Sequence, residues 1–358
     1  MALGAVKINL FLLPGEAGGA TNIAAEEHSL AYGEHIPPKT IDELIADRGR
    51  IERSLKDNEE RPTAAELKEF GVDLSRMLFP GDVNSLYFAA SKHRIQITLC
   101  TTDTRLKQIP WEYVVWPDVK EGPHVTRTFA RSVPVPNGSE RAPKSISGSD
   151  IKVLLIGADV LGRDRIPWNE TKENLERILG ARLQGPSAAR ISLDMVEGGT
   201  RESVQKALDS KNYDIVHFIG HGRPDGIFLR GEDQKGVVLP TAAFSQMVVE
   251  TDPALVILSA CETGMIEDIA PLGTIAETLV KSGVPAVVAN QMPITVRSVA
   301  DFTGALYRSL LAEGNIDVAV NKGRMELVKT IEALKWAAVE WGIPVLYRRP
   351  GCSQLFTP

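Results

Sequence analysis

Long apolar runs, aromatic side chains and cysteines are all scarce in this chain. No apolar stretch approaches the ~20 residues of a membrane-spanning helix, and the strand-like run at residues 6–13 is too short for a signal peptide's apolar core plus cleavage site. Three cysteines among 358 residues do not make a disulfide framework. Aromatic residues at 6% give no sign of a base-stacking surface. We therefore expect a cytoplasmic protein without a membrane segment.

An excess of positive charge is missing as well. Asp and Glu total 46 against 40 for Lys and Arg, so the formal net charge is −6. This balance argues against a general affinity for nucleic acid or anionic membranes. Residues 157–162 (Gly-Ala-Asp-Val-Leu-Gly) lack the Gly-x-Gly-x-x-Gly spacing of a nucleotide-binding turn, and we interpret them as a loop. We predict no cofactor and no metal site.

Two blocks of the same kind organise the second half of the chain. Residues 214–222 read Asp-Ile-Val-His-Phe-Ile-Gly-His-Gly, and residues 254–264 read Ala-Leu-Val-Ile-Leu-Ser-Ala-Cys-Glu-Thr-Gly. In each block an apolar, strand-forming run stops at a reactive side chain among small residues, His221 in the first and Cys261 in the second. Short apolar runs separated by a dozen or more residues are typical of neighbouring parallel strands buried on both faces.

The segment between the two blocks predicts how they are connected. Residues 240–250 are suited to a crossover helix, with Thr241 as its N-cap. Because the carboxyl ends of parallel strands meet at one edge of a sheet, we expect His221 and Cys261 to emerge together. That edge is where open α/β sheets place their sites.

A thiol beside an imidazole is a nucleophile beside a base. At a reference pKa of about 8.5 a cysteine is only a few per cent thiolate at pH 7, and an adjacent histidine activates it by accepting its proton. Gly222 lets the backbone approach a reacting carbonyl closely. The backbone N–H groups of Gly222 and Cys261 are therefore candidates for an oxyanion hole.

These blocks resemble the caspase-like cysteine peptidases of clan CD, and in particular their CHAT subgroup. Further segments fit this resemblance, namely residues 106–112 (Leu-Lys-Gln-Ile-Pro-Trp-Glu), 284–291 (Val-Pro-Ala-Val-Val-Ala-Asn-Gln) and 302–314. The resemblance implies that His221 and Cys261 are the catalytic pair. His217 falls four residues too early, and we interpret it as a strand histidine that makes a local hydrogen bond.

The order of predicted elements defines the fold class. Residues 151–358 alternate apolar strands with helices, which predicts an α/β domain with a mostly parallel sheet and helices on both faces. The resemblance implies that this domain is caspase-like. Residues 1–135 predict an N-terminal α+β region, for which a pseudo-caspase-like fold stays open. It includes a helix near 64–78 that begins with the capping box of Thr63 and Glu66. The Pro-, Ser- and Gly-rich residues 136–150 predict a linker.

The specificity of such a site is harder to read. The candidate walls of a substrate pocket follow the reactive strands, and acidic ones would favour a basic substrate residue whereas Met292 would favour an apolar one. Asp225 also has the alternatives of orienting the imidazole or forming a plain turn. The candidate pocket residues are Asp225, Glu262, Glu267, Asp268, Asn290 and Met292.

The sequence thus predicts a selective cysteine endopeptidase that cleaves a protein substrate through a thioester. The family resemblance implies a role in bacterial defence or programmed cell death, for example by activating a pore-forming protein encoded nearby. An activating partner protein stays open. The alternatives are a catalytically silent caspase-like module that binds a partner, and a hydrolase or transferase of another fold that uses the same pair of side chains.

Overall fold

Two compact units make up the chain. The computed structural model describes residues 5–14, 21–26, 30–35, 39–56, 62–119, 123–135, 142–145, 151–161, 166, 168–182, 191–223, 225–260, 273–331 and 339–357. The first unit comprises Met1–Ser132 and Arg324–Ile343, and the second comprises Val133–Gly323 and Pro344–Pro358. Compact units are not by themselves independently folding domains. The division into 1–135, a linker and 151–358 therefore stays a prediction.

The first unit is built on a mixed sheet with the strand order β3-β2-β1-β4-β5 in its described part. β1 pairs in parallel with β4, and β4 with β5, whereas β1, β2 and β3 form an antiparallel meander. The strands are β1 (Val6–Pro14), β2 (Thr21–Glu26), β3 (Leu30–His35), β4 (Ile95–Cys100) and β5 (Arg127–Ser132).

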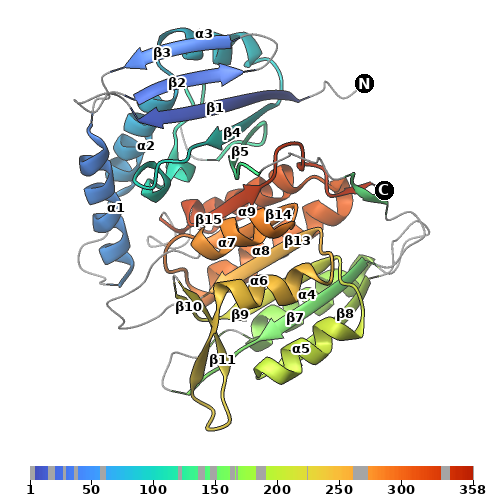
Figure 1. The fold of residues 1–358 in the computed structure, drawn as a ribbon. Coiled ribbons are helices and arrows are strands. Elements are labelled where there is room, and N and C mark those ends of the chain that lie inside the picture. The colour runs from blue at the N-terminus through green and yellow to red at the C-terminus, as the bar shows by residue number, and fades with distance from the viewer. Residues whose placement is uncertain are drawn as a thin grey trace. The chain divides into compact units, whose positions relative to one another are not determined.

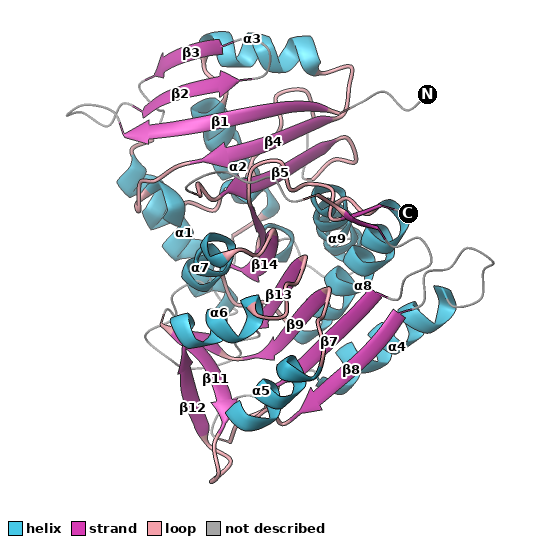
Figure 2. Ribbon diagram, turned by 45° about the vertical axis from the view of Figure 1, so that its right-hand side comes forward, coloured by secondary structure: helices cyan, strands magenta, loops and turns pink. Residues whose placement is uncertain are grey.

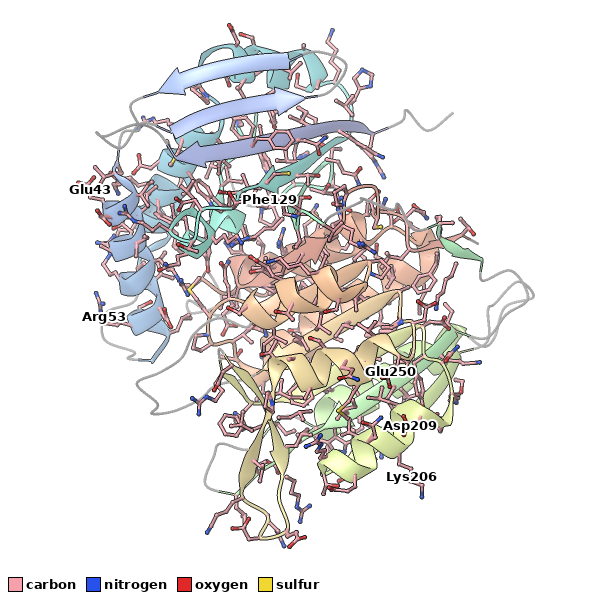
Figure 3. All side chains as sticks on the ribbon, viewed as in Figure 1. Glu43, Arg53, Phe129, Lys206, Asp209 and Glu250 are labelled. Atoms are coloured by element: carbon pink, nitrogen blue, oxygen red, sulfur yellow. The ribbon has the colours of Figure 1, made fainter. Side chains whose placement is uncertain are left out.

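Helices and aromatic side chains complete the first unit. Its helices are α1 (Ile41–Lys56), α2 (Ala64–Leu78) and α3 (Gly81–Ala90), with short 3₁₀ turns at Leu106–Gln108, Trp111–Tyr113 and Glu340–Gly342. The predicted capping box of Thr63 and Glu66 is present at the start of α2. Trp111, fully buried, and Phe129 on β5 belong to the core (Figure 3).

A buried ion pair fixes the loop before β5. Arg131 of β5 binds Glu112 through two hydrogen bonds, Nε to Oε1 at 2.9 Å and Nη2 to Oε2 at 2.6 Å. Two more of its N–H groups bind the carbonyls of Lys107 and Ile109, at 2.8 and 3.1 Å. Buried charges are stable only when paired and hydrogen-bonded, and these four bonds give the guanidinium such partners.

The second unit contains a mostly parallel sheet with the order β15-β14-β13-β9-β7-β8 in its described residues (Figure 1). All neighbours are parallel except β14 and β15, which are antiparallel. The strands are β7 (Ile151–Gly157), β8 (Ile191–Glu197), β9 (Ile215–Gly220), β13 (Leu255–Ala260), β14 (Ala286–Asn290) and β15 (Pro344–Arg348). The expected α/β class with a mostly parallel sheet is confirmed.

Helices cover both faces of this sheet (Figure 2). On one face, α5 (Arg201–Ser210), α6 (Thr241–Val249) and α7 (Gly273–Ser282) pack against alternate strand residues, such as Val216 and Phe218, in one hydrophobic core. On the other face lie α4 (Trp168–Arg182) and α8 (Val296–Glu313), which are joined by a hydrogen bond from Asn174 to the carbonyl of Ala300. The central strands β9, β13 and β14 are mostly apolar because both of their faces are buried.

Smaller elements border the main sheet. A three-stranded antiparallel sheet of β10 (Gly222–Arg223), β11 (Gly226–Arg230) and β12 (Gly236–Pro240) lies between β9 and α6 in the sequence. β6 (Lys144–Ser145) pairs with β16 (Phe356–Thr357). α9 (Ile316–Ile331) begins in the second unit and ends in the first.

Two local predictions need correction. The crossover helix α6 is capped by Pro240 without a side-chain hydrogen bond, and Thr241 is its first helical residue, so Thr241 is not the N-cap. Its buried hydroxyl has no hydrogen-bond partner among the described residues. The stretch between the histidine and the helix is also not a plain loop, because residues 226–240 form the β11–β12 hairpin.

Candidate active site

The strands predicted to carry the reactive side chains end side by side. β9 and β13 pair in parallel, with Ile219 opposite Ser259 and Gly220 opposite Ala260. The two strands therefore reach the carboxyl edge of the sheet at the same level. Parallel neighbours need a long connection. The connection from β9 to β13 contains the β11–β12 hairpin, followed by the helix α6.

His221 is the first residue after β9, and it is buried with only 2% of its surface exposed. Its carbonyl accepts a hydrogen bond from the N–H of Phe228 at 2.9 Å, which fastens the start of β10 to β11. The backbone that presents this imidazole is thus held by two neighbours, the β9 strand and the hairpin. Such support is what a positioned general base needs.

Gly222 follows in the same turn and pairs with Ile227 of β11. In an antiparallel ladder, hydrogen-bonded pairs alternate with pairs that are not hydrogen-bonded. His221 and Phe228 form a hydrogen-bonded pair, so the N–H of Gly222 points away from β11. It is a backbone donor that the ladder does not use.

The cysteine predicted to pair with His221 falls outside the described part of the chain. The described residues of β13 end at Ala260, and Cys261 is the next residue in the sequence. Three pocket candidates, Glu262, Glu267 and Asp268, lie outside the described residues too. The pairing of Cys261 with His221 and the acidic wall therefore stay predictions.

The histidine inside β9, His217, is held in place by neighbouring side chains. His217 is fully buried; its Nε2 lies 2.9 Å from the Ser259 hydroxyl of β13, and its Nδ1 lies 3.5 Å from the hydroxyl of Tyr307 on α8. Its ring stacks on Tyr307 with 6.1 Å between the ring centres. Burial lowers the pKa of His217 from 6.5 to about 3, so it is neutral at pH 7. The pattern in the sequence gave no sign of Ser259 and Tyr307 as its partners.

Asp225 lies in the turn between β10 and β11. Its carboxylate forms an ion pair with Arg223, with Nε and Oδ1 2.5 Å apart, and both side chains are exposed. Its carbonyl accepts a hydrogen bond from Thr241 at 2.8 Å, at the start of α6. The carboxylate is therefore engaged by the turn's own arginine and does not contact the imidazole.

The two remaining pocket candidates lie at the end of β14. Asn290 is the last residue of that strand, 9% exposed, and Met292 follows two residues later, 4% exposed. β14 pairs with β13 in parallel, with Leu258 opposite Ala289, so both strands end at the same edge of the sheet. Asn290 and Met292 are thus next to the strand that precedes Cys261, although little of either is accessible.

Other site types find no support in the described residues. No group of three or more His, Cys, Asp or Glu side chains there is arranged to hold a metal ion. None of the described helices has the length and apolarity to cross a membrane.

A mostly parallel sheet with helices on both faces and a buried histidine at its carboxyl edge defines an α/β protein of the caspase-like class. The CHAT domain family matches residues 68–343, which is more than half of the chain. The chain therefore belongs to the CHAT domain family, a caspase-like family of clan CD. No curated protein matches it.

Solved structures show the same fold. The separase–securin complex of Saccharomyces cerevisiae is similar with a TM-score of 0.54 and 11% identity, over 96% of this chain and 30% of that one. The Arg-specific cysteine proteinase gingipain R is similar with a TM-score of 0.48 and 12% identity, over 88% of this chain and 74% of that one. At such identities the likeness to separase is one of fold. This chain spans less than a third of the separase chain.

Proposed function

We propose that this protein is a cysteine endopeptidase in which His221 and Cys261 cleave a protein substrate. The observation that carries the proposal is the register of β9 and β13, with Gly220 opposite Ala260. The next residues in the sequence are His221 on one strand and Cys261 on the other. Membership of a caspase-like family supports the same assignment.

The chemistry proceeds through a thioester. His221 accepts the thiol proton of Cys261, and the thiolate attacks the scissile carbonyl carbon. The C–N bond then breaks while the imidazolium returns its proton to the departing amine. Water, deprotonated by His221, hydrolyses the thioester and restores the thiol, so protons and bonds balance over the cycle.

Backbone donors stabilise the oxyanion formed in each step. The N–H of Gly222 points away from the β10–β11 ladder, which supports its assignment to the oxyanion hole together with the N–H of Cys261. Each donor of this kind contributes about 3 kcal/mol to lowering the barrier. The backbone of His221 is fastened to Phe228 by a hydrogen bond, and we assign no third catalytic side chain.

We further propose that the substrate is a protein cut at a single site and encoded near this chain. Asn290 and Met292, at the end of β14, are the described candidates for the pocket that selects the residue before the cut. The proposal also includes an activating partner protein and a role in bacterial defence, because the resemblance to CHAT peptidases implies both.

The test is cleavage profiling of a peptide library and of proteins encoded beside this chain. Wild type and Cys261→Ala are compared in parallel, with Cys100→Ala as the matched thiol control, because Cys100 also lies at the carboxyl end of a parallel strand. We expect cuts by wild type and by Cys100→Ala and none by Cys261→Ala.

Two results would contradict the proposal. Cuts that persist in Cys261→Ala would assign the hydrolysis to another group or a contaminant. Absence of cuts from a folded, reduced wild-type protein, together with no labelling of Cys261 by peptide electrophiles, would favour a silent module that binds a partner.

A further inference from the structure

A concave feature lies at the carboxyl edge of the second unit's sheet, the edge at which His221 follows β9. A pocket of about 150 Å³ opens where β7 and β8 end, and the end of β11 closes one side of it. Its volume suits a single side chain rather than a whole cofactor. Its polar and aromatic lining residues are Asp159, Trp168, Asn169, Glu197 and Arg230.

Backbone hydrogen bonds tie this pocket to the strand that leads into His221. The N–H of Gly199 binds the carbonyl of Gly157 at 2.8 Å, and the N–H of Arg230 binds the carbonyl of Gly199 at 2.9 Å. At the residue after Gly157, the N–H of Ala158 binds the carbonyl of Ile219 in β9 at 2.9 Å. The pocket walls and the histidine turn are therefore parts of one continuous backbone network.

The charged groups of the pocket are not used for internal pairing. Among the described residues, neither Asp159 nor Glu197 forms an ion pair, and the same is true of the Arg230 guanidinium. Trp168 is 7% exposed, and its indole N–H is buried without a hydrogen-bond partner in the described part of the chain.

The signs of these groups select the ligand. A lysine or arginine side chain would meet Arg230 beside the two carboxylates, and an aspartate or glutamate would meet both carboxylates beside Arg230. An apolar side chain would offer no hydrogen-bond partner to any of the three charged groups. A carboxamide serves both signs at once, because its oxygen accepts from the guanidinium while its NH₂ donates to a carboxylate.

The position of the pocket places it beside the leaving half of a substrate. β7 is the next strand to β9, on the side away from β13, and β8 is one strand further. Neighbouring strands lie about 4.8 Å apart, and the pocket lies at the ends of β7 and β8. Its centre is therefore about 7 Å from the axis of β9, which is about the length of two residues of extended peptide. The general acid His221 must lie at the departing amine, so the chain after the cut begins on this side.

We propose that this pocket is a subsite for a glutamine or asparagine side chain about two residues after the scissile bond. The proposal rests on the proposed peptidase function and names a specificity of that same site. It assigns the pocket residues to substrate recognition and gives them no part in the bond-breaking step.

A peptide series tests the proposal. Each of the first four positions after the cut carries Gln, Asn, Leu, Lys or Glu in turn, in a sequence that wild type cleaves. We expect Gln or Asn at the second or third position to raise kcat/KM about three- to tenfold over the other three, the range for hydrogen bonds in a partly exposed pocket. A preference for Lys, for Glu or for Leu there, or no preference, would overturn the proposal.

Charge-neutral variants give the proposal its own signature. Arg230→Gln should raise cleavage of the Lys peptide relative to the Gln peptide, and Glu197→Gln should do the same for the Glu peptide. Arg201→Gln and Glu202→Gln on α5 are the matched controls. The charged side chains of that helix are exposed, as Lys206 and Asp209 show (Figure 3). Equal effects in variants and controls would exclude a role for the pocket.

A binding measurement separates this proposal from the proposed function. Cys261→Ala protein is titrated by calorimetry with the same uncut peptides, which requires no catalysis. Tighter binding of the Gln peptide, lost in Arg230→Gln, would support the subsite even if no cleavage were found. Equal Kd values for all five peptides, with cleavage intact in wild type, would overturn the subsite and leave the peptidase function standing.

Discussion

Each unit of this protein has a cysteine at the carboxyl end of a parallel strand, and the two sites differ in what surrounds them. In the first unit, Cys100 ends β4, and its register partners are Phe11 on β1 and Ser132 on β5. In the second unit, Cys261 follows β13, whose neighbour β9 continues into His221. A strand-end thiol becomes a nucleophile where a base lies beside it, which is the arrangement proposed for Cys261.

Charged groups in the core and charged groups at the pocket differ in the same sense. Arg131 with Glu112 in the first unit, and Arg348 with Asp317 in the second, form buried ion pairs. Glu197 and Arg230 line a pocket at the strand ends without forming ion pairs in the described residues. Internal pairing is typical of groups that stabilise a fold, whereas charged groups left around a pocket are typical of binding. The comparison assigns stability to the first set and recognition to the second.

The largest effect should come from substitution of His221, compared with substitution of His217 in the preceding strand β9. His221→Ala should lower kcat/KM about 10²- to 10⁴-fold, because it removes the general base and acid. His217→Gln should retain cleavage, since its ring packs between Ser259 and Tyr307. Peptide cleavage assays, with circular dichroism to check folding, compare the two. Equal losses in both variants would contradict the distinction between a catalytic and a structural histidine.

The next largest effect concerns the first unit. Arg131→Met leaves the Glu112 carboxylate buried without its cation, and we expect unfolding to become easier by about 3–5 kcal/mol. Urea denaturation of the full chain measures this change. The double variant Arg131→Met with Glu112→Leu should recover much of the loss. A single variant as stable as wild type would show that the pair is not part of the first unit's stability.

A smaller effect is expected in the dependence of stability on pH. The pKa of His217 is about 3 in the folded protein and about 6.5 when unfolded. Below pH 6.5 the unfolded state therefore binds a proton that the folded state does not, so stability falls as pH falls from 6.5 towards 3, by about 1.4 kcal/mol per pH unit.

His217→Gln removes this term. Between pH 6.5 and pH 5 the variant should lose about 2 kcal/mol less stability than wild type, measured by urea denaturation at both pH values. Parallel slopes for wild type and His217→Gln would contradict a buried neutral imidazole.

The smallest effect should follow removal of a helix cap. Thr200 caps α5 by accepting a hydrogen bond from the N–H of Ser203 at 3.2 Å. Thr200→Ala should cost about 1 kcal/mol of stability, and Thr200→Ser should cost much less because it retains the hydroxyl. Thermal unfolding of the two variants checks the difference. Equal Tm values for both would mean that the cap does not stabilise α5.

Much of the fold could be predicted where local signals are strong. The capping box of Thr63 and Glu66 predicted the start of α2 correctly, and the apolar runs predicted β7, β9 and β13. The β2–β3 meander was missed, because residues 21–26 (Thr-Asn-Ile-Ala-Ala-Glu) contain few strong strand formers and pair as a strand beside β1 and β3. Tertiary pairing decided that segment against its local preference.

The site divides in the same way. The position of His221 followed from a strand end in the sequence, and its burial and hairpin contact agree with a positioned side chain. The pocket of Trp168, Glu197 and Arg230 was not predicted, since it assembles from three elements far apart in the chain. Glu197 ends β8, whose polar residues Ser192 and Asp194 hide it from the rule that found the histidine after an apolar strand.

The most direct test of the central claim is the pH dependence of alkylation at each cysteine, followed by mass spectrometry. In wild type, Cys261 should react with iodoacetamide with an apparent pKa well below the ~8.5 of a free thiol, while the buried Cys352 should react slowly. In His221→Ala the profile of Cys261 should move back towards 8.5. A profile of Cys261 that is the same in both proteins would contradict a catalytic pair of His221 and Cys261.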